Sequence, residues 1–256
     1  MRIRIGGIVG VVVLAALGLT LAAPTLASSL RADKIVRKHV KALGGKKRKA
    51  ITAIRTVGRV EVRGMEISFT AWRRRPDLSR LEVNIMGFDV VQAYDGKTAW
   101  WVNPIVGATE PTEMPADYAR EVLRWTDFDG PLVDYKKKRH KIKYVGRERL
   151  DTGEAYKLRI RLANGDEWHV YIDSRTYLEV KRSYTQTYQG QTSTVDTYFS
   201  DFFEVDGLTT PRVIRGVGLG GEPFIMTFDS LDTRIEADGA RFDMPGRKKR
   251  RFGWAY

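Results

Sequence analysis

The sequence predicts a mainly β (α+β) protein built on one strongly curved antiparallel sheet of about eleven strands. Most of the chain after residue 59 alternates apolar and polar residues with the period of two that half-buried strands show. Turn residues interrupt this alternation at short intervals, which is typical of an antiparallel meander. Only two segments have helical periodicity. Because so long a sheet tends to curl, and two helices cannot fill a large barrel, we expect an apolar cavity inside it.

The segment 88–104 predicts the clearest hairpin. Asp95-Gly96 separates two apolar strands, and this dipeptide favours a type I′ turn, in which both central residues need positive φ. Successive side chains of a strand point to opposite faces, so Trp100 and Trp101 place one indole on each face of the sheet. Both faces must therefore be covered here, and the pattern leaves open which indole faces the interior.

The remaining elements follow from periodicity and from residues that end helices and strands. Helices are expected at 32–43, ended by Gly44-Gly45, and from Pro115 to Trp125. Residues 104–113 are expected to form a loop. Besides the two arms of the hairpin, strands are expected at 60–63, 67–71, 81–85, 142–145, 155–162, 168–172, 177–184, 193–203, 211–217 and 223–231. No linker rich in Pro, Gly or Ser divides the chain, so one domain is expected.

The N-terminus has the composition of an export signal. Arg2 and Arg4 precede an apolar run over 5–23, and small residues follow around Ala27, which together are typical of a secretory signal peptide over 1–27. An uncleaved membrane anchor is the alternative, because the apolar run nearly spans a bilayer. Either way, the rest of the chain is expected in the periplasm. The chain has no cysteine, so the exported part depends on its core and not on disulfides.

The formal net charge of +13 comes from basic clusters, of which the last lies in the tail 247–256 next to Trp254 and two other aromatic residues. Export argues against nucleic acid as the partner, and an anionic membrane surface is favoured in its place. For the internal clusters, solvated turns and strand edges are an equally good interpretation. The residues expected to contact the membrane are Arg247, Lys248, Lys249, Arg250, Arg251 and Trp254.

Motifs of catalysis are not evident. The three histidines, His39, His140 and His169, have no metal-ligand spacing, and no GxSxG or Walker motif occurs. Residues 216–221 match GxGxxG by letter, but a predicted strand follows in place of a helix, so a hairpin tip is expected. We expect no catalytic residue, metal or cofactor, and hence no enzyme. A hydrolase whose residues are dispersed in the sequence is the alternative.

Apolar and aromatic residues carry the remaining functional prediction. An ordinary β core is one interpretation, and a pocket that buries an acyl chain at about 0.8 kcal/mol per methylene is the other. The candidates for the pocket wall are Ile67, Phe69, Leu81, Val83, Ile85, Val91, Trp100, Trp101, Tyr118, Val122, Leu123, Val170 and Ile172.

Several short motifs occur in a characteristic order along the chain. They are Leu43-Gly44-Gly45, Arg75-Pro76-Asp77, Tyr94-Asp95-Gly96, Trp100-Trp101, Asn103-Pro104, Gly130-Pro131, Tyr171-Ile172-Asp173, Gly207-Leu208-Thr209-Thr210-Pro211 and Phe242-Asp243-Met244-Pro245. In this order the chain resembles the LolA-like periplasmic outer-membrane lipoprotein-sorting proteins, a group that includes LolB-like and LppX-like lipid binders. The resemblance covers nearly all of the chain after the signal segment.

The resemblance implies an incomplete barrel over residues 28–246, closed by helices over a hydrophobic cavity. Such a cavity would hold acyl chains of lipoproteins or lipids, for transfer towards the outer membrane. The alternative is a non-catalytic, lipid-sensing regulator of the same fold, which would bind a membrane-anchored protein partner.

Overall fold

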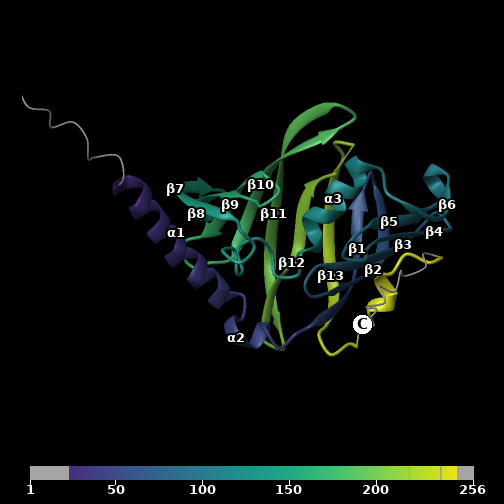
Figure 1. Ribbon diagram of the computed structural model, residues 1–256, viewed down its shortest axis with the longest axis horizontal. Helices are drawn as coiled ribbons and strands as arrows, with labels where there is room; N and C mark the ends of the chain where they lie inside the picture. Colours follow the sequence, from purple (N-terminus) through teal and green to yellow (C-terminus); the bar gives the residue numbers. More distant parts are fainter. Residues whose placement is uncertain (1–22, 219, 237, 247–256) are drawn as a thin grey trace, which may run out of the picture.

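The computed structural model describes residues 23–218, 220–236 and 238–246. This part of the chain contains one antiparallel sheet of thirteen strands, in the order β6-β5-β4-β3-β2-β1-β13-β12-β11-β10-β9-β8-β7 (Figure 1). The order is linear, with β6 and β7 at its two edges. The predicted mainly β, antiparallel class is confirmed, whereas the prediction of about eleven strands is wrong. The predicted signal segment up to residue 22 and the tail 247–256 lie outside the described residues.

The strands are β1 (Ala53–Val62), β2 (Met65–Arg74), β3 (Leu78–Ile85), β4 (Phe88–Tyr94), β5 (Ala99–Asn103), β6 (Ala108–Glu113), β7 (Lys141–Leu150), β8 (Gly153–Arg161), β9 (Glu167–Asp173), β10 (Glu179–Tyr188), β11 (Gln191–Val205), β12 (Leu208–Val217) and β13 (Pro223–Asp232). The helices are α1 (Ala23–Ala42), α2 (Gly45–Arg48) and α3 (Ala116–Thr126), with the 3-10 turns η1 (Pro104–Val106) and η2 (Gly239–Phe242). Strands that follow one another in the chain pair as antiparallel neighbours, except β6 and β7, which form the two edges; β1 pairs with β13, which joins the two halves of the sheet.

Several strand boundaries differ from the sequence-based expectation, and the largest differences concern β1 and β6. β1 begins at Ala53 and not at residue 60, because Ala53 and Ile54 are buried on opposite faces, which removes the alternation of hydropathy. β6 replaces part of the expected loop. This edge strand exposes most of its residues, so it carries no apolar period. Alternating hydropathy predicts a strand only where one face of the strand is buried and the other is exposed to solvent.

The helix α1 begins nine residues before the expected start. Its central turns carry the apolar stripe of Ala32, Ile35 and Val36, and this stripe is what the sequence pattern detected. Ser28 is nevertheless held to the sheet, since its hydroxyl donates to the carbonyl oxygen of Tyr144 at 2.8 Å. α3 lies where it was expected, with Pro115 as its N-cap residue.

The hairpin at Asp95-Gly96 is confirmed, but its turn is not type I′. Gly96 has φ +91°, whereas Asp95 is not among the residues with positive φ. The Asp95 carboxylate accepts hydrogen bonds from the backbone N–H groups of Lys97 (2.8 Å) and Thr98 (2.7 Å). This side-chain bonding stabilises a four-residue loop between Tyr94 and Ala99.

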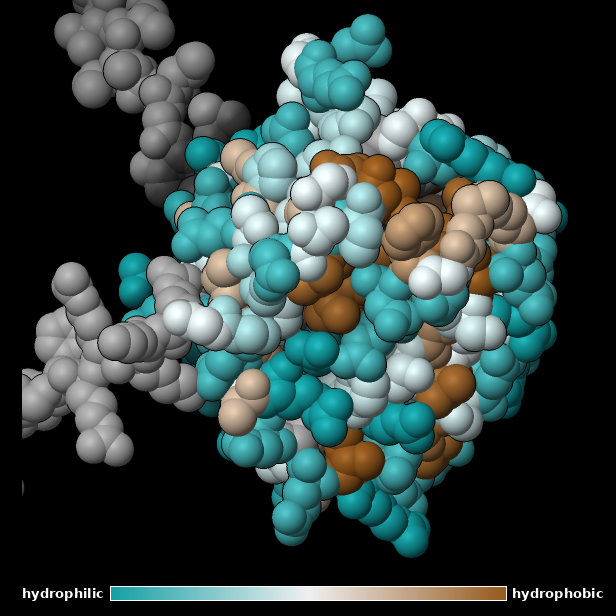
Figure 2. Space-filling view, turned by 90° about the vertical axis from the view of Figure 1, so that its right-hand side faces the viewer, coloured by the Kyte–Doolittle hydropathy of each residue, from teal (hydrophilic) through white to brown (hydrophobic). Residues whose placement is uncertain are grey.

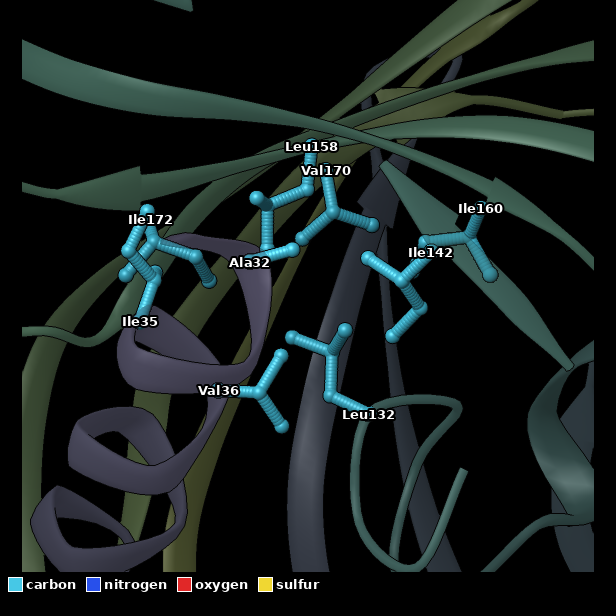
Figure 3. Packing of buried hydrophobic residues seen from close by; sticks show 9 residues of the cluster. All are labelled: Ala32, Ile35, Val36, Leu132, Ile142, Leu158, Ile160, Val170 and Ile172. Atoms are coloured by element: carbon cyan, nitrogen blue, oxygen red, sulfur yellow. The ribbon is translucent and has the colours of Figure 1, made fainter. Parts of the chain in front are cut away.

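The helices cover the two ends of one face of the sheet, here called the inner face (Figure 1). At one end, Ala32, Ile35 and Val36 of α1 point toward apolar residues of β7, β8 and β9 (Figure 3). At the other end, α3 packs over β4 and β5. The central strands β1, β2 and β11–β13 lie between these two covered regions.

The register decides how the adjacent tryptophans are placed. Trp101 lies on the inner face under α3, with its ring centroid 5.0 Å from that of Tyr118. Trp100 lies on the outer face, where its indole N–H donates to the carbonyl oxygen of Phe242 in η2 at 2.9 Å. Each indole is almost fully buried, so the C-terminal segment covers the outer face as α3 covers the inner one.

Candidate ligand cavity

A cavity of about 400 Å³ lies on the inner face between α1 and α3. Its wall consists of the central strands, α3, the segment 127–132 and the C-terminal end of α1. A volume of this size falls within the roughly 300–1,000 Å³ of small-molecule sites. The cavity exists because the two helices cover the ends of the sheet and leave its middle open.

Aromatic side chains dominate the apolar wall. Phe69 of β2 meets Phe228 of β13 edge to face, with ring centroids 6.0 Å apart. Trp125 of α3 meets Phe199 of β11 in the same way at 6.5 Å. Such edge contacts hold the rings in place around the open space. The aromatic lining residues are Phe69, Trp72, Trp125, Phe128, Phe199, Phe202, Phe224 and Phe228.

Two arginines of the wall are neutralised by local carboxylates. Arg182 of β10 donates to Glu179 at 2.7 Å and 3.0 Å, and its guanidinium lies 5.0 Å from the Trp168 ring centroid. Arg124 of α3 pairs with Glu121 one turn earlier and lies 4.6 Å from the ring centroid of Tyr184. Burial raises the pKa of Tyr184 to about 12, so this phenol stays neutral. These pairs add polarity to the wall without adding net charge.

A stronger ion-pair cluster closes one end of the cavity. The Asp129 carboxylate accepts from Arg48 Nε at 2.9 Å and from Arg75 Nε and Nη2 at 2.9 Å and 2.5 Å. Burial alone would raise the pKa of Asp129, but these hydrogen bonds outweigh it and lower the pKa to about 2. The Arg75 guanidinium also lies 4.4 Å from the ring centroid of Phe128. Asp129 thus ties its own segment to α2 and to the end of β2.

Arg73 differs from the other arginines of the wall. It projects from β2 on the same face as Phe69 and Ala71, and all three line the cavity. Among the described residues, no carboxylate lies within ion-pair distance of its guanidinium, whose central carbon lies 6.0 Å from the ring centroid of Phe128. Burial, followed by the charge of Arg48, lowers the pKa of Arg73 to about 10.

The predicted wall residues are found in several places. Phe69, Leu81 and Val122 line the cavity. Ile67, Val83 and Ile85 share the inner face but do not line it, whereas Val170 and Ile172 are buried beneath α1. Trp101 packs against Tyr118 of α3, and neither residue lines the cavity.

Three predicted wall residues face away from the cavity. Trp100 and Val91 belong to the outer face, because each lies one position away from an inner-face residue in its strand. Leu123 is 43% exposed on α3. The predicted membrane-contact residues from Arg247 to Trp254 lie outside the described residues.

Sequence reasoning missed the charged part of the wall. The basic cluster Arg73-Arg74-Arg75 was expected at a solvated turn or a membrane surface. The structure separates its members, since Arg73 lines the cavity while Arg75 holds Asp129. The alternation Phe69, Ala71, Arg73 already placed this arginine on an apolar face, and that pattern could have identified it.

The face that bears β4–β6 is mostly hydrophilic, and its apolar side chains form separate patches (Figure 2). Exposed apolar residues near this end of the sheet include Met86, Phe88, Ile105 and Val106.

In the described ranges, no helix is both long and apolar enough to cross a membrane.

Comparisons with solved structures agree with this architecture. A DUF1329 family protein from Desulfovibrio piger has a TM-score of 0.60 at 12% identity, covering 84% of this chain and 97% of its own. A putative outer membrane lipoprotein-sorting protein domain from Vibrio parahaemolyticus has a TM-score of 0.58 at 9% identity, covering 83% and 97%. A LolA superfamily protein from Nitrosomonas europaea has a TM-score of 0.57 at 12% identity, with the same coverage of 83% and 97%.

The protein has a LolA-like fold. No protein-family model matches the sequence, and no curated protein matches it. The predicted resemblance is therefore confirmed at the level of structure, at identities too low for a sequence comparison. Within the LolA-like fold of this chain, α1 and α3 flank an aromatic cavity that contains one arginine without a recorded carboxylate partner among the described residues.

Proposed function

We propose that the protein is a non-catalytic periplasmic carrier that binds the acyl chain of a lipid or lipoprotein in the cavity, for transfer towards the outer membrane. The observation that carries the proposal is the aromatic cavity of about 400 Å³ on the inner face of a LolA-like sheet. The similarity to a structure described as a putative lipoprotein-sorting domain supports the same class of cargo.

The shape of the lining suits an extended chain. Inner-face residues of β2 line the cavity from Arg73 to Phe69, and β13, on the far side of β1, continues the wall through Phe228 and Met226 to Phe224. Ile67 pairs with Val60, and Val60 pairs with Met226, so these three residues lie at one level of the sheet. From Arg73 to that level there are six residue steps, or about 20 Å at about 3.4 Å per residue. Burial of each methylene contributes about 0.8 kcal/mol, so an apolar wall of this length can bind an acyl chain without catalytic groups.

The export signal over 1–27 and the basic-aromatic tail complete the proposed carrier. The signal segment would direct the protein to the periplasm. The tail would hold it near an anionic membrane surface, where each Lys or Arg contributes roughly 1 kcal/mol. We propose helices α1 and α3 as the elements that close the cavity over its cargo, because residues of both lie in its wall.

Filling the cavity with a larger side chain should weaken ligand binding. The variant Ala71→Phe places a ring in the wall between β1 and β3, and displacing about two methylenes of ligand should weaken uptake of a fluorescent fatty acid roughly tenfold. Titration of the purified protein with the probe, followed by fluorescence, measures the change.

The matched control is Ser68→Phe, which adds the same ring to the exposed outer face of β2. It should bind the probe like the parent protein. Equal affinity of all three proteins, or a parent protein that takes up no probe and releases no lipid on extraction, would overturn the proposed function.

A further inference from the structure

We propose that the cavity selects an anionic amphiphile, whose carboxylate or phosphate head pairs with the Arg73 guanidinium while its apolar chain lies along the aromatic wall. This inference rests on the proposed carrier function and names the chemical class of its cargo. It depends on three observations: the position of Arg73, the pairing of the other charges around it, and the apolar direction in which the wall continues.

The position of Arg73 places its charge inside the ligand space. β1 and β3 flank β2, and the residues opposite Arg73 are Ile54 and Ser79, both of which line the same cavity. The Phe128 ring centroid lies 6.0 Å from the guanidinium carbon, and this ring has no hydrogen-bond acceptor in its plane. A planar guanidinium has five N–H donors arranged to bind a carboxylate or a phosphate with two parallel hydrogen bonds.

The carboxylates around the cavity are already occupied. Asp129 is held by Arg48 and Arg75, and Asp127 is held by Lys138 at 2.6 Å and 2.7 Å. The other two carboxylates of the wall, Glu121 and Glu179, pair with Arg124 and Arg182. Each of these acids therefore has a basic partner of its own, and among the described residues Arg73 has no carboxylate within ion-pair distance.

Such a charge is expensive in an apolar space unless a ligand compensates it. The Arg73 side chain is half-buried, and burial disfavours its charged form and lowers its pKa, but arginine keeps its proton at physiological pH. An anionic head would supply the missing acceptors. From Arg73, the wall continues along β2 to Ala71 and Phe69, so a chain attached to that head meets only apolar side chains on this strand.

The test compares two ligands that differ only in the head group. Dodecanoate should bind the purified protein at least tenfold more tightly than dodecanol, measured by calorimetry or by displacement of a fluorescent probe. The variant Arg73→Met removes the charge and keeps an apolar stem of similar length. It should lose the preference, with dodecanoate weakened at least tenfold and dodecanol unchanged or tighter, whereas Arg73→Lys should keep part of the preference.

The matched control is Arg55→Met on the neighbouring strand β1. Arg55 is exposed and is not a residue of the cavity wall, so its loss changes the net charge equally without removing a lining side chain. This variant should retain the full preference for dodecanoate. A melting curve for each variant establishes that it is folded, and Arg73→Met should melt no lower than the parent protein.

Further ligands separate the sources of the anion. Tighter binding of dodecyl phosphate than of dodecanoate would identify a phosphate head, and the reverse order a fatty acid; both support the inference. Inorganic phosphate that binds the protein as tightly as dodecyl phosphate would overturn it, since the chain would then contribute nothing.

The inference and the proposed function can fail separately. If dodecanol and dodecanoate bind equally well to the parent protein and to Arg73→Met, the carrier function stands and the anion site is refuted. If neither amphiphile binds the parent protein, both proposals fall.

Discussion

Replacing Asp129 by Asn is expected to lower the free energy of unfolding by roughly 2–3 kcal/mol, less than for a fully buried ion pair because the Asp129 side chain is 22% exposed. The substitution leaves the Arg48 and Arg75 guanidinium groups without their shared carboxylate, and the Arg48 side chain is only 9% exposed. The free energies of unfolding of the parent protein and the variant, obtained from urea denaturation, measure the loss.

The variant Asp134→Asn is the control for this prediction. It makes the same chemical change five residues away, where the carboxylate pairs with Lys137 at 3.5 Å and both side chains are largely exposed. Exposed pairs contribute roughly 0–1 kcal/mol, so this variant should unfold almost like the parent protein. A loss for Asp129→Asn no larger than for Asp134→Asn would contradict the role assigned to the cluster.

The same cluster predicts how stability depends on pH. The pKa of Asp129 is about 2 in the folded protein and roughly 3.9 in an unfolded chain. Its contribution is therefore fully present at pH values above the unfolded pKa and is lost as the pH falls towards 2. The stability difference between the parent protein and Asp129→Asn should be constant near neutral pH and should shrink below about pH 4. Urea denaturation repeated from pH 7 to pH 2 tests this.

The variants Trp100→Ala and Trp101→Ala should each cost roughly 3–5 kcal/mol, since both indoles are almost fully buried. Their effects on ligand uptake should differ. Trp101 supports Tyr118 of α3, and the same helix contributes Val122 and Trp125 to the cavity wall. Its loss should loosen that wall and weaken binding of a fluorescent fatty acid. Trp100 packs against η2 on the outer face and should leave the affinity unchanged.

The comparison requires a temperature at which both variants are folded, as judged by near-ultraviolet circular dichroism. Probe titrations under those conditions separate affinity from stability. An equal loss of affinity in the two variants would show that uptake follows global stability and not the packing under α3.

Period two in the sequence was enough to predict the antiparallel sheet, because most strands have one apolar and one polar face. It failed at the start of β1, where Ala53 and Ile54 are buried on opposite faces of the sheet. It also failed at β6, where residues of both faces are exposed. The Asp95-Gly96 pair predicted a hairpin correctly and its turn type wrongly. The Asp95 carboxylate accepts hydrogen bonds from the N–H groups of Lys97 and Thr98. These side-chain hydrogen bonds favour a four-residue loop over the type I′ turn.

The charged part of the candidate site was harder to predict than the fold. Asp129 finds Arg48 and Arg75 at sequence separations of 81 and 54 residues, and no local pattern encodes such pairing. The apolar candidates were selected by residue type, so they mixed residues of the cavity wall with residues of the cores beneath α1 and α3. Register separates these groups, and register becomes known only when the strands are paired.

The linear strand order has a mechanical consequence for the proposed carrier function. A closed barrel has a fixed circumference, because every strand is hydrogen-bonded on both sides. In the described sheet, β6 and β7 are the two free margins, so the wall can tighten or relax by small changes of twist while every ladder hydrogen bond is kept. Under the proposed function, this flexibility would let one sheet bind ligands of different width without unfolding any strand.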